Sequence, residues 1–368
     1  MKNAPRISAA LRGGPDLLVK DVWLRPYALP LKAPWRAASA TLAIRRGMLI
    51  GIAAGQKNGW GDCAPLPSSG EAGHARTFAA LDQAARGLRG LTLEAAFARL
   101  GVIESAEARW AVETALLDVF WRERGAPLRR AFNPDARDAV AVNAALGPLD
   151  QNCAERAAAA LAQGFVFAKI KVGVSGVEDE LRLLHEASSR VERRLRLRLD
   201  ANRAWSDADA HRFLEGVAHL PIDGVEEPLA NPSEERLRLL QSTVPFALAV
   251  DESLFEIGAE KLFAMQTVRR LVLKPARIGG FAATLRLAEK AAAAKLEVVV
   301  TSVVDSAIGV AAAAQLAASL GGTQAHGLAT GDWLAADVAA PLPIKDGMLQ
   351  LPDGAGLGIV PTDQLAQF

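Results

Sequence analysis

The chain has 368 residues, of which 51% are hydrophobic and 23% are charged. These fractions are ordinary for a globular protein and exclude a disordered, collagen-like or coiled-coil chain as a whole. The 42 basic residues balance the 41 acidic ones, so no overall field would attract nucleic acid or an anionic membrane. We therefore expect neither as a partner, and the length predicts either two domains or one large barrel with an extension.

Cysteine content and apolar runs bear on the expected compartment. Cys63 and Cys153 are too few for a disulfide framework and lack the spacing of a zinc site. Residues 1–20 lack the apolar core of a signal peptide, and the apolar run at 296–304 is too short to span a bilayer. These features predict a cytoplasmic protein. The sequence makes no prediction about its oligomeric state.

Residues 1–135 predict a separate α+β domain. Alternating apolar residues indicate antiparallel strands at 22–29 and 46–53, with a turn at Gly59–Gly61. Helical periodicity then predicts helices at 72–88 and 106–120. Strands followed by helices are typical of an α+β unit.

In residues 136–332, short β-rich runs alternate with longer helical ones. Strands are expected at 139–146, 167–172, 195–199, 224–225, 247–250, 271–273, 298–300 and, weakly, 327–329. Helices are expected at 153–162, 177–190, 207–217, 281–294 and 307–318. Eight nearly continuous apolar strands fit a closed parallel barrel better than an open sheet. The Pro- and Gly-rich tail, 333–368, is expected to be non-helical and to return to the N-terminal domain.

An ionisable cluster follows each of five successive predicted strands. The clusters are Lys169-Ile170-Lys171, Asp200-Ala201-Asn202, Glu226-Glu227-Pro228, Asp251-Glu252-Ser253 and Lys274-Pro275. They recur every 23 to 29 residues, which is about the length of one βα unit. Because the carboxyl ends of barrel strands converge on one mouth, the clusters predict an active site there.

The residue types at these positions indicate metal-assisted proton abstraction. Asp200, Glu226 and Asp251 can offer oxygens to Mg²⁺, with Mn²⁺ as a substitute. Lys171 and Lys274 precede and follow this trio, so they are expected on opposite sides of a small-molecule carboxylate substrate. Lys169 and Lys171 are two residues apart, so both should point into the barrel, and each ammonium group next to the other and to Mg²⁺ is expected to have its pKa lowered toward the range of a general base.

Several assignments have alternatives. Any single acidic residue after a strand is usually a helix cap, and only the phased set favours a metal site. Neighbours on a strand point to opposite sides, so only one of Glu226 and Glu227, and one of Asp251 and Glu252, is expected to reach the metal, and the other to orient or cap. Lys169 could instead be an ion-pair partner inside the barrel. The roles of Asp305 and Arg36, at the mouth or in capping and solvated positions, stay open.

The ordered motifs KIK, DAN, EEP, DES and LKP resemble those of the enolase superfamily, in its muconate-cycloisomerase-like subgroup. The resemblance implies a modified (β/α)₇β TIM barrel with an N-terminal α+β capping domain that the C-terminal tail completes. It also implies roles for individual residues. Asp200, Glu226 and Asp251 match the metal ligands, Lys171 the usual base, Lys274 the opposite lysine, and Lys169 and Asn202 supporting residues.

Within this subgroup, segments 59–67, 197–205, 301–309 and 326–331 look most like the o-succinylbenzoate synthase family. That likeness implies Mg²⁺-dependent syn-dehydration of 2-succinyl-6-hydroxy-2,4-cyclohexadiene-1-carboxylate through an enediolate, in menaquinone biosynthesis. Thr301, Ser302 and Gly327 match positions that contact the succinyl group. The alternatives are an N-acylamino acid racemase, a dipeptide epimerase, a cycloisomerase or, less favoured, a non-catalytic binding barrel. The last strand lacks the Asp-x-Asp typical of dipeptide epimerases.

Overall fold

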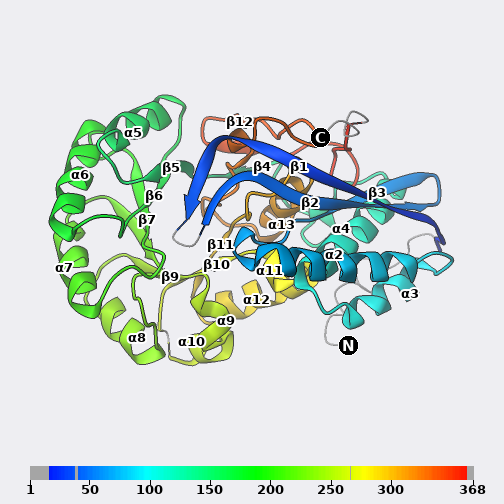
Figure 1. Ribbon diagram of the computed structural model, residues 1–368, viewed down its shortest axis with the longest axis horizontal. Coiled ribbons are helices and arrows are strands. Elements are labelled where there is room, and N and C mark those ends of the chain that lie inside the picture. The colour runs from blue at the N-terminus through cyan, green and yellow to red at the C-terminus, as the bar shows by residue number, and fades with distance from the viewer. Residues whose placement is uncertain (1–15, 38–39, 266, 363–368) are drawn as a thin grey trace.

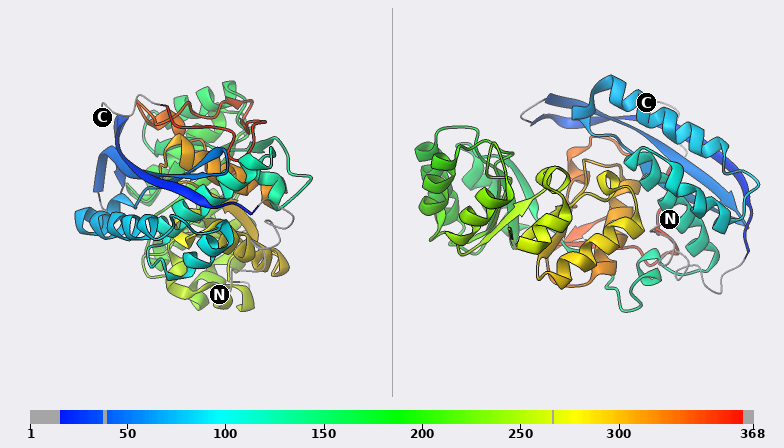
Figure 2. Two further views of the ribbon diagram at one scale, coloured as in Figure 1. Left: turned by 90° about the vertical axis from the view of Figure 1, so that its right-hand side faces the viewer. Right: turned by 90° about the horizontal axis from the view of Figure 1, so that it is seen from below.

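The computed structural model describes residues 16–37, 40–265 and 267–362, and shows a parallel barrel sheet capped by an antiparallel domain (Figure 1). The barrel strands and their outer helices form one end of the molecule, and the N-terminal sheet with its helices forms the other (Figure 2). The expected fold class, an α/β barrel with an N-terminal α+β cap, is confirmed.

The N-terminal sheet consists of β1 (Val19–Ala37), β2 (Ala40–Ala54) and β3 (Lys57–Cys63), paired antiparallel in that order. Helices α2 (Gly70–Arg86), α3 (Leu93–Ala98) and α4 (Ala106–Glu123) follow, with short 3₁₀ turns at Pro67–Ser69, Arg99–Val102 and Leu128–Ala131. Helix α4 begins where the Ser105 side chain accepts a hydrogen bond from the Ala108 N–H.

The predicted turn at Gly59–Gly61 is wrong, because this segment lies inside β3 and pairs with β2. Its glycines serve packing instead. A Cβ atom at Gly59 would lie 2.2 Å from the Ala115 carbonyl oxygen, and one at Gly61 would lie 1.9 Å from the Ala111 oxygen. The missing side chains therefore let β3 approach the backbone of α4 closely.

This close packing predicts that Gly61→Ala destabilises the protein by about 1–3 kcal/mol, since rigid helix backbone must move to admit the methyl group. Urea unfolding measures the change. Gly101→Ala is the control, because a Cβ there meets nothing within 4 Å, and surface changes of this kind cost less than about 0.5 kcal/mol. Equal stability of the two variants would refute the packing role of Gly61.

The barrel sheet contains seven parallel strands in chain order. They are β5 (Ala144–Pro148), β6 (Phe167–Lys171), β7 (Arg196–Asp200), β8 (Ile222–Glu226), β9 (Ala247–Val250), β10 (Arg270–Leu273) and β11 (Glu297–Val300). Both faces of the central strands are buried, which explains their continuous apolar runs.

Helices follow the strands of this sheet, and those between residues 153 and 242 cover its outer side (Figure 1). The helices are α5 (Cys153–Ala162), α6 (Val177–Arg190), α7 (Asp207–Val217), α8 (Glu234–Ser242), α9 (Ser253–Ile257), α10 (Ala259–Met265), α11 (Pro275–Ile278), α12 (Phe281–Ala293) and α13 (Ala307–Leu320). The sequence analysis did not predict α8 to α11. Three of these four are shorter than eight residues, so they span too few turns for an apolar period to show.

The eighth predicted strand, 327–329, is reduced to two bridges that close the barrel. His326 pairs with Val142 on one side, and Gly327 pairs with Thr301 on the other. The Gly327 N–H donates to the Val300 carbonyl oxygen at 2.8 Å, and the Asn143 N–H donates to that of His326 at 3.0 Å. Two residues thus join the last strand of the sheet to the first.

The predicted strand 139–146 divides into β5 and a separate short strand, β4 (Ala139–Ala141). β4 pairs with β13 (Met348–Gln350) of the C-terminal tail, which pairs in turn with β12 (Ile344–Lys345). The tail also contains a 3₁₀ turn, Gly331–Trp333.

Two other tail segments contact the N-terminal domain. The Ala335 N–H donates to the Pro30 carbonyl oxygen of β1 at 2.8 Å, and the Leu357 N–H donates to the Asp118 carboxylate of α4 at 2.6 Å. The tail therefore hydrogen-bonds to both halves of the molecule. Within the described residues, no helix combines the length and apolar character needed to cross a membrane.

Candidate active site

Three buried carboxylates lie side by side at the carboxyl ends of β7, β8 and β9. Asp200 is paired in register with Glu226 across the β7–β8 ladder, and Asp251 directly follows β9. Their residues are only 1%, 7% and 3% exposed. The neighbouring Glu252 is exposed at the start of α9, so alternation along the chain selects Asp251 as the inward residue.

Lysine ammonium groups lie directly against these carboxylates. Lys169 Nζ is 2.7 Å from Glu226 Oε2 and 2.9 Å from Asp200 Oδ2, so it bridges the two acids. Lys171 Nζ donates to Asp200 Oδ2 at 2.7 Å and to the Asn202 amide oxygen at 2.5 Å.

Lys274, which follows β10, donates to the carboxylate of Asp251. The predicted ligands and lysines thus form one connected cluster. Its two outer lysines, Lys171 and Lys274, pair with different carboxylates, Asp200 and Asp251.

The ion pairs shift the pKa values in ways that the sequence analysis only partly anticipated. Burial alone would lower the pKa of Lys169 and of Lys274, but the adjacent carboxylates outweigh burial and raise both. In this arrangement the pKa of Lys169 is thus raised, the opposite of the lowering expected for it next to Lys171 and Mg²⁺. Burial, followed by repulsion from Asp200, raises the pKa of Glu226 to about 7, and burial raises the pKa of Asp251.

Among the described residues, no three carboxylate, histidine or cysteine side chains converge closely enough to form a metal-binding cluster. Lysine ammonium groups lie against all three candidate carboxylates instead. The donor set still suits a hard divalent cation. It offers only carboxylate oxygens, carried at the ends of adjacent strands, and such oxygens are the ligands that hard cations prefer.

Comparisons with known proteins identify the family. The family model of the enolase C-terminal domain-like proteins matches residues 152–365, more than half of the chain. The o-succinylbenzoate synthase of Thermobifida fusca is 30% identical over 320 residues, covering 85% of this chain and 82% of that protein. The chain belongs to the enolase superfamily. Within it, the relatives place the chain in the muconate-cycloisomerase-like subgroup.

Other members of the superfamily are similar to comparable degrees. The chloromuconate cycloisomerase of Pseudomonas putida is 33% identical over 204 residues, covering 54% of this chain and about half (55%) of that relative's length. The crystal structure of the Enterococcus faecalis dipeptide epimerase, complexed with Mg and the dipeptide L-Leu-L-Tyr, superposes with a TM-score of 0.84 at 24% identity. It covers 93% of this chain and 99% of that one. This last likeness establishes the fold alone.

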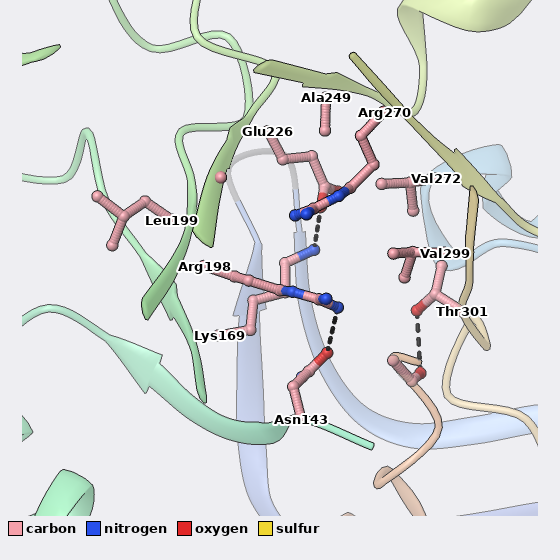
Figure 3. A pocket seen from close by; sticks show the side chains of 12 residues that line it. Asn143, Lys169, Arg198, Leu199, Glu226, Ala249, Arg270, Val272, Val299 and Thr301 are labelled. Carbon is pink, nitrogen blue, oxygen red and sulfur yellow. Dashed lines mark hydrogen bonds and ion pairs between the residues drawn. The ribbon is translucent and has the colours of Figure 1, made fainter. Parts of the chain in front are cut away.

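The remaining predicted site residues lie at the seam where this enolase-superfamily barrel closes. Thr301 Oγ1 donates to the Gly327 carbonyl oxygen at 3.0 Å, and Ser302 Oγ lies 2.8 Å from Thr330 Oγ1. Thr301 and Gly327 also line an interior cavity of about 20 Å³ together with Lys169 and Glu226 (Figure 3). A space of that size holds about one water molecule.

A charged layer that was not predicted from the sequence lies inside the barrel, on the far side of this cavity from the mouth. Arg198 and Arg270 each donate to Asp223 Oδ2 at 2.8 Å, and both line the cavity (Figure 3). Their positions follow the strand period, because Arg198 precedes Asp200 by two residues and Arg270 precedes Lys274 by four. Counting back in steps of two from Asp200 and Lys274 would have found the two arginines.

A second missed cluster attaches the capping domain to the loop after β11. Arg45 of β2 is fully buried and donates to the carbonyl oxygens of Val304 at 2.9 Å and Ala64 at 2.7 Å. Asp62 of β3 accepts hydrogen bonds from the Tyr27 hydroxyl at 2.7 Å and the Ser306 hydroxyl at 2.8 Å. Three cap strands thus hold the loop that carries Thr301 and Ser302.

The same loop contains a strained residue and an acid without a full set of partners. Val304 has a φ of +62°, which is unusual for a β-branched side chain. Asp305 is 5% exposed, its Oδ1 accepts no hydrogen bond, and its ion pair with Arg45 spans 3.9 Å. Asp305 does not cap α13, since the Ser306 and Ala307 N–H groups donate to Asp62 and Asp337. The side chain of Arg36 lies outside the described residues.

Asp305→Asn is expected to stabilise the protein at pH 8 and to stabilise it less at pH 5. Burial, followed by repulsion from Asp62, raises the pKa of Asp305 to about 7. A folded pKa above the unfolded value of about 4 means that stability from this group is lost as pH rises from about 4 to 7. Asparagine cannot ionise, so the variant avoids that loss.

Urea unfolding at the two pH values measures this effect, and we expect the gain in stability at pH 8 to exceed the gain at pH 5 by about 2–3 kcal/mol. Asp353→Asn, at an exposed position, is the control and should show the same difference from the wild type at both pH values. An Asp305→Asn variant whose stability relative to wild type does not change with pH would contradict the buried-acid interpretation.

Proposed function

We propose that this protein is an o-succinylbenzoate synthase, a Mg²⁺-dependent lyase that removes water from 2-succinyl-6-hydroxy-2,4-cyclohexadiene-1-carboxylate. The observation that carries the proposal is the pairing of two lysines with different members of one carboxylate trio. Lys171 contacts Asp200, and Lys274 contacts Asp251 two strands further along the sheet. Such an arrangement can take a proton from the carbon next to a carboxylate that is held between the lysines.

Asp200, Glu226 and Asp251 are the residues that would hold the metal ion. Mg²⁺ bound there would attach the substrate carboxylate and stabilise the negative charge that proton removal leaves on it, and Mn²⁺ could take its place. The dipeptide epimerase with the same fold was crystallised with Mg, which supports the choice of metal.

The chain's own lysines would carry out the proton transfers. Lys171 would remove the α-proton and then return a proton to the departing hydroxyl group on the same face, as a syn-dehydration requires. The Asn202 amide oxygen accepts a hydrogen bond from Lys171 and so orients its ammonium group. Lys274 would remain protonated and balance the charge of the substrate carboxylate.

The substrate assignment rests on the loops around the mouth. A T. fusca o-succinylbenzoate synthase is similar over most of both chains, and the segment 327–330, Gly-Leu-Ala-Thr, lacks the Asp-x-Asp of dipeptide epimerases. We assign the succinyl contacts to Thr301, Ser302 and Gly327, which adjoin one another at the barrel seam.

A second candidate is an N-acylamino acid racemase. The specific observation in its favour is the same pair of lysines, because racemisation needs one acid–base group on each face of the α-carbon. The mouth chemistry is then identical, and the cap loops around residues 33–41 and 67–71 decide between the two activities.

A direct assay separates the candidates. The protein is incubated with Mg²⁺ and the cyclohexadiene substrate, and dehydration is followed by ultraviolet absorbance. A parallel panel of N-succinyl and N-acetyl amino acids is followed by polarimetry. We expect fast dehydration and slow racemisation. Racemisation without dehydration would favour the racemase over the synthase. The absence of both activities would contradict both candidate functions.

A further inference from the structure

The second glutamate of the EEP motif is buried and holds the neighbouring loop. Glu227 is 1% exposed, and its Oε1 accepts hydrogen bonds from the Asp251 and Ser253 N–H groups, each at 2.8 Å. Its Oε2 accepts one from the Ser253 hydroxyl at 2.5 Å and one from Arg203 Nε at 3.2 Å. One carboxylate therefore fixes the backbone on both sides of Glu252.

These contacts link three successive barrel loops. Arg203 lies in the loop after β7, Glu227 in the loop after β8, and Ser253 at the start of α9 after β9. The Arg203 N–H also donates to the Glu227 carbonyl oxygen at 2.7 Å. Each of these loops directly follows one candidate metal ligand. Glu227 therefore contacts the segment that carries the third ligand, Asp251, without being one of the three ligands itself.

The backbone at these turns is held in an uncommon conformation. Asn202, Arg203 and Glu227 have φ values of +43°, +64° and +47°, although none is glycine. Conformations of this kind cost of order 1–3 kcal/mol each and persist only where the surroundings enforce them. The Glu227 side-chain hydrogen bonds are the enforcing contacts between the second and third loops.

We propose that Glu227 is a positioning residue that holds Asp251 in place for metal binding while itself binding neither metal nor substrate. This inference rests on the proposed function, because it assumes that Asp251 is a ligand. Without the carboxylate, two buried N–H groups lose their acceptor and the loop relaxes to satisfy them. Outer residues that orient metal ligands typically change metal affinity by 10–100-fold when they are replaced.

Two substitutions separate the contribution of the negative charge of Glu227 from that of its hydrogen-bond acceptor oxygen. Glu227→Gln keeps one oxygen able to accept from the Asp251 and Ser253 N–H groups, but it loses the ionic contact with Arg203. Glu227→Ala loses every contact. If positioning depends on the backbone hydrogen bonds, glutamine retains the function and alanine does not.

The chain offers a matched control in Asp118 of α4. This carboxylate is also fully buried, and it also accepts two backbone N–H groups and an arginine, namely Trp60, Leu357 and Arg122. It lies in the capping domain, away from the ligand-bearing loops. Asp118→Ala should reduce the stability of the fold without changing the affinity for metal.

The test is calorimetric titration of Mg²⁺ into metal-free full-length wild type, Glu227→Ala, Glu227→Gln and Asp118→Ala, with a thermal melt of each. We expect about 10–100-fold weaker Mg²⁺ binding in Glu227→Ala. In Glu227→Gln and Asp118→Ala we expect Mg²⁺ affinity within about threefold of wild type. If Glu227→Ala does not fold, Ser253→Ala, which removes one of the Glu227 contacts, should still bind Mg²⁺ measurably more weakly than Asp118→Ala.

Two results would overturn the inference while leaving the proposed function intact. One is wild-type Mg²⁺ affinity in Glu227→Ala, or in Ser253→Ala where that variant takes its place. The other is an equal loss of affinity in Asp118→Ala, which would mean that any weakening of the fold has the same effect. A wild-type protein that binds no Mg²⁺ would overturn the proposed function itself and this inference with it.

Discussion

Lys171→Ala is expected to lower kcat by about 10⁴-fold while leaving the fold intact. A positioned general base contributes up to about that factor, and in the proposed reaction the same ammonium group also supplies the proton to the leaving hydroxyl. The side chain is 27% exposed and contacts only Asp200 and Asn202 among the interactions described. Its loss removes no core packing, so the melting temperature should change by less than about 4 °C.

Steady-state assays with matched variants check this expectation. Lys171→Arg keeps the positive charge but cannot act as a base at neutral pH, so it should be as inactive as the alanine variant. Lys345→Ala, on the exposed end of β12, should retain full activity. Substantial turnover by Lys171→Ala would mean that the base is assigned to the wrong residue.

Removal of divalent metal is expected to abolish activity, and added Mg²⁺ or Mn²⁺ should restore it. Without the metal ion, the substrate carboxylate would face the buried acids Asp200, Glu226 and Asp251, and repulsion would oppose its binding. The negative charge formed by proton removal would also lack its main counter-charge. We therefore expect a loss of at least about 10³-fold in kcat/KM, comparable to the loss of a major electrostatic contact.

The experiment is dialysis against EDTA, with metal content checked by elemental analysis, followed by assay with and without added Mg²⁺. Protein dialysed against EDTA already saturated with Mg²⁺ is the control for effects of the chelator itself. Full activity in protein shown to be metal-free would contradict the proposed role of the three carboxylates.

The sequence could predict that the candidate site residues lie together because the barrel repeats with a regular length. Asp200, Glu226 and Asp251 stay in phase with one βα unit, so parallel strands bring them together without further information. The alternation of side chains along a strand predicted that only one of Asp251 and Glu252 would point inward, and the structure has Asp251 buried and Glu252 exposed. Both arguments are local or periodic, which is why a single sequence was sufficient.

Contacts between distant segments could not be predicted in the same way. Arg45 and Asp62 belong to the capping domain, and nothing in their local sequence indicates that they reach the loop containing Val304 and Ser306. The glycines of β3 resembled a turn because their function, the close approach of α4, depends on a helix some 50 residues further along the chain. The lysine pKa values depend on which carboxylate each ammonium group contacts, which is also a tertiary property.

The most direct measurement is a crystal structure of the protein with Mg²⁺ and o-succinylbenzoate, the product of the proposed reaction. The account predicts one metal ion on Asp200, Glu226 and Asp251, with the product carboxylate between Lys171 and Lys274 and its succinyl group beside Thr301 and Gly327. A metal ion bound elsewhere, or a product whose carboxylate does not lie between the two lysines, would contradict it.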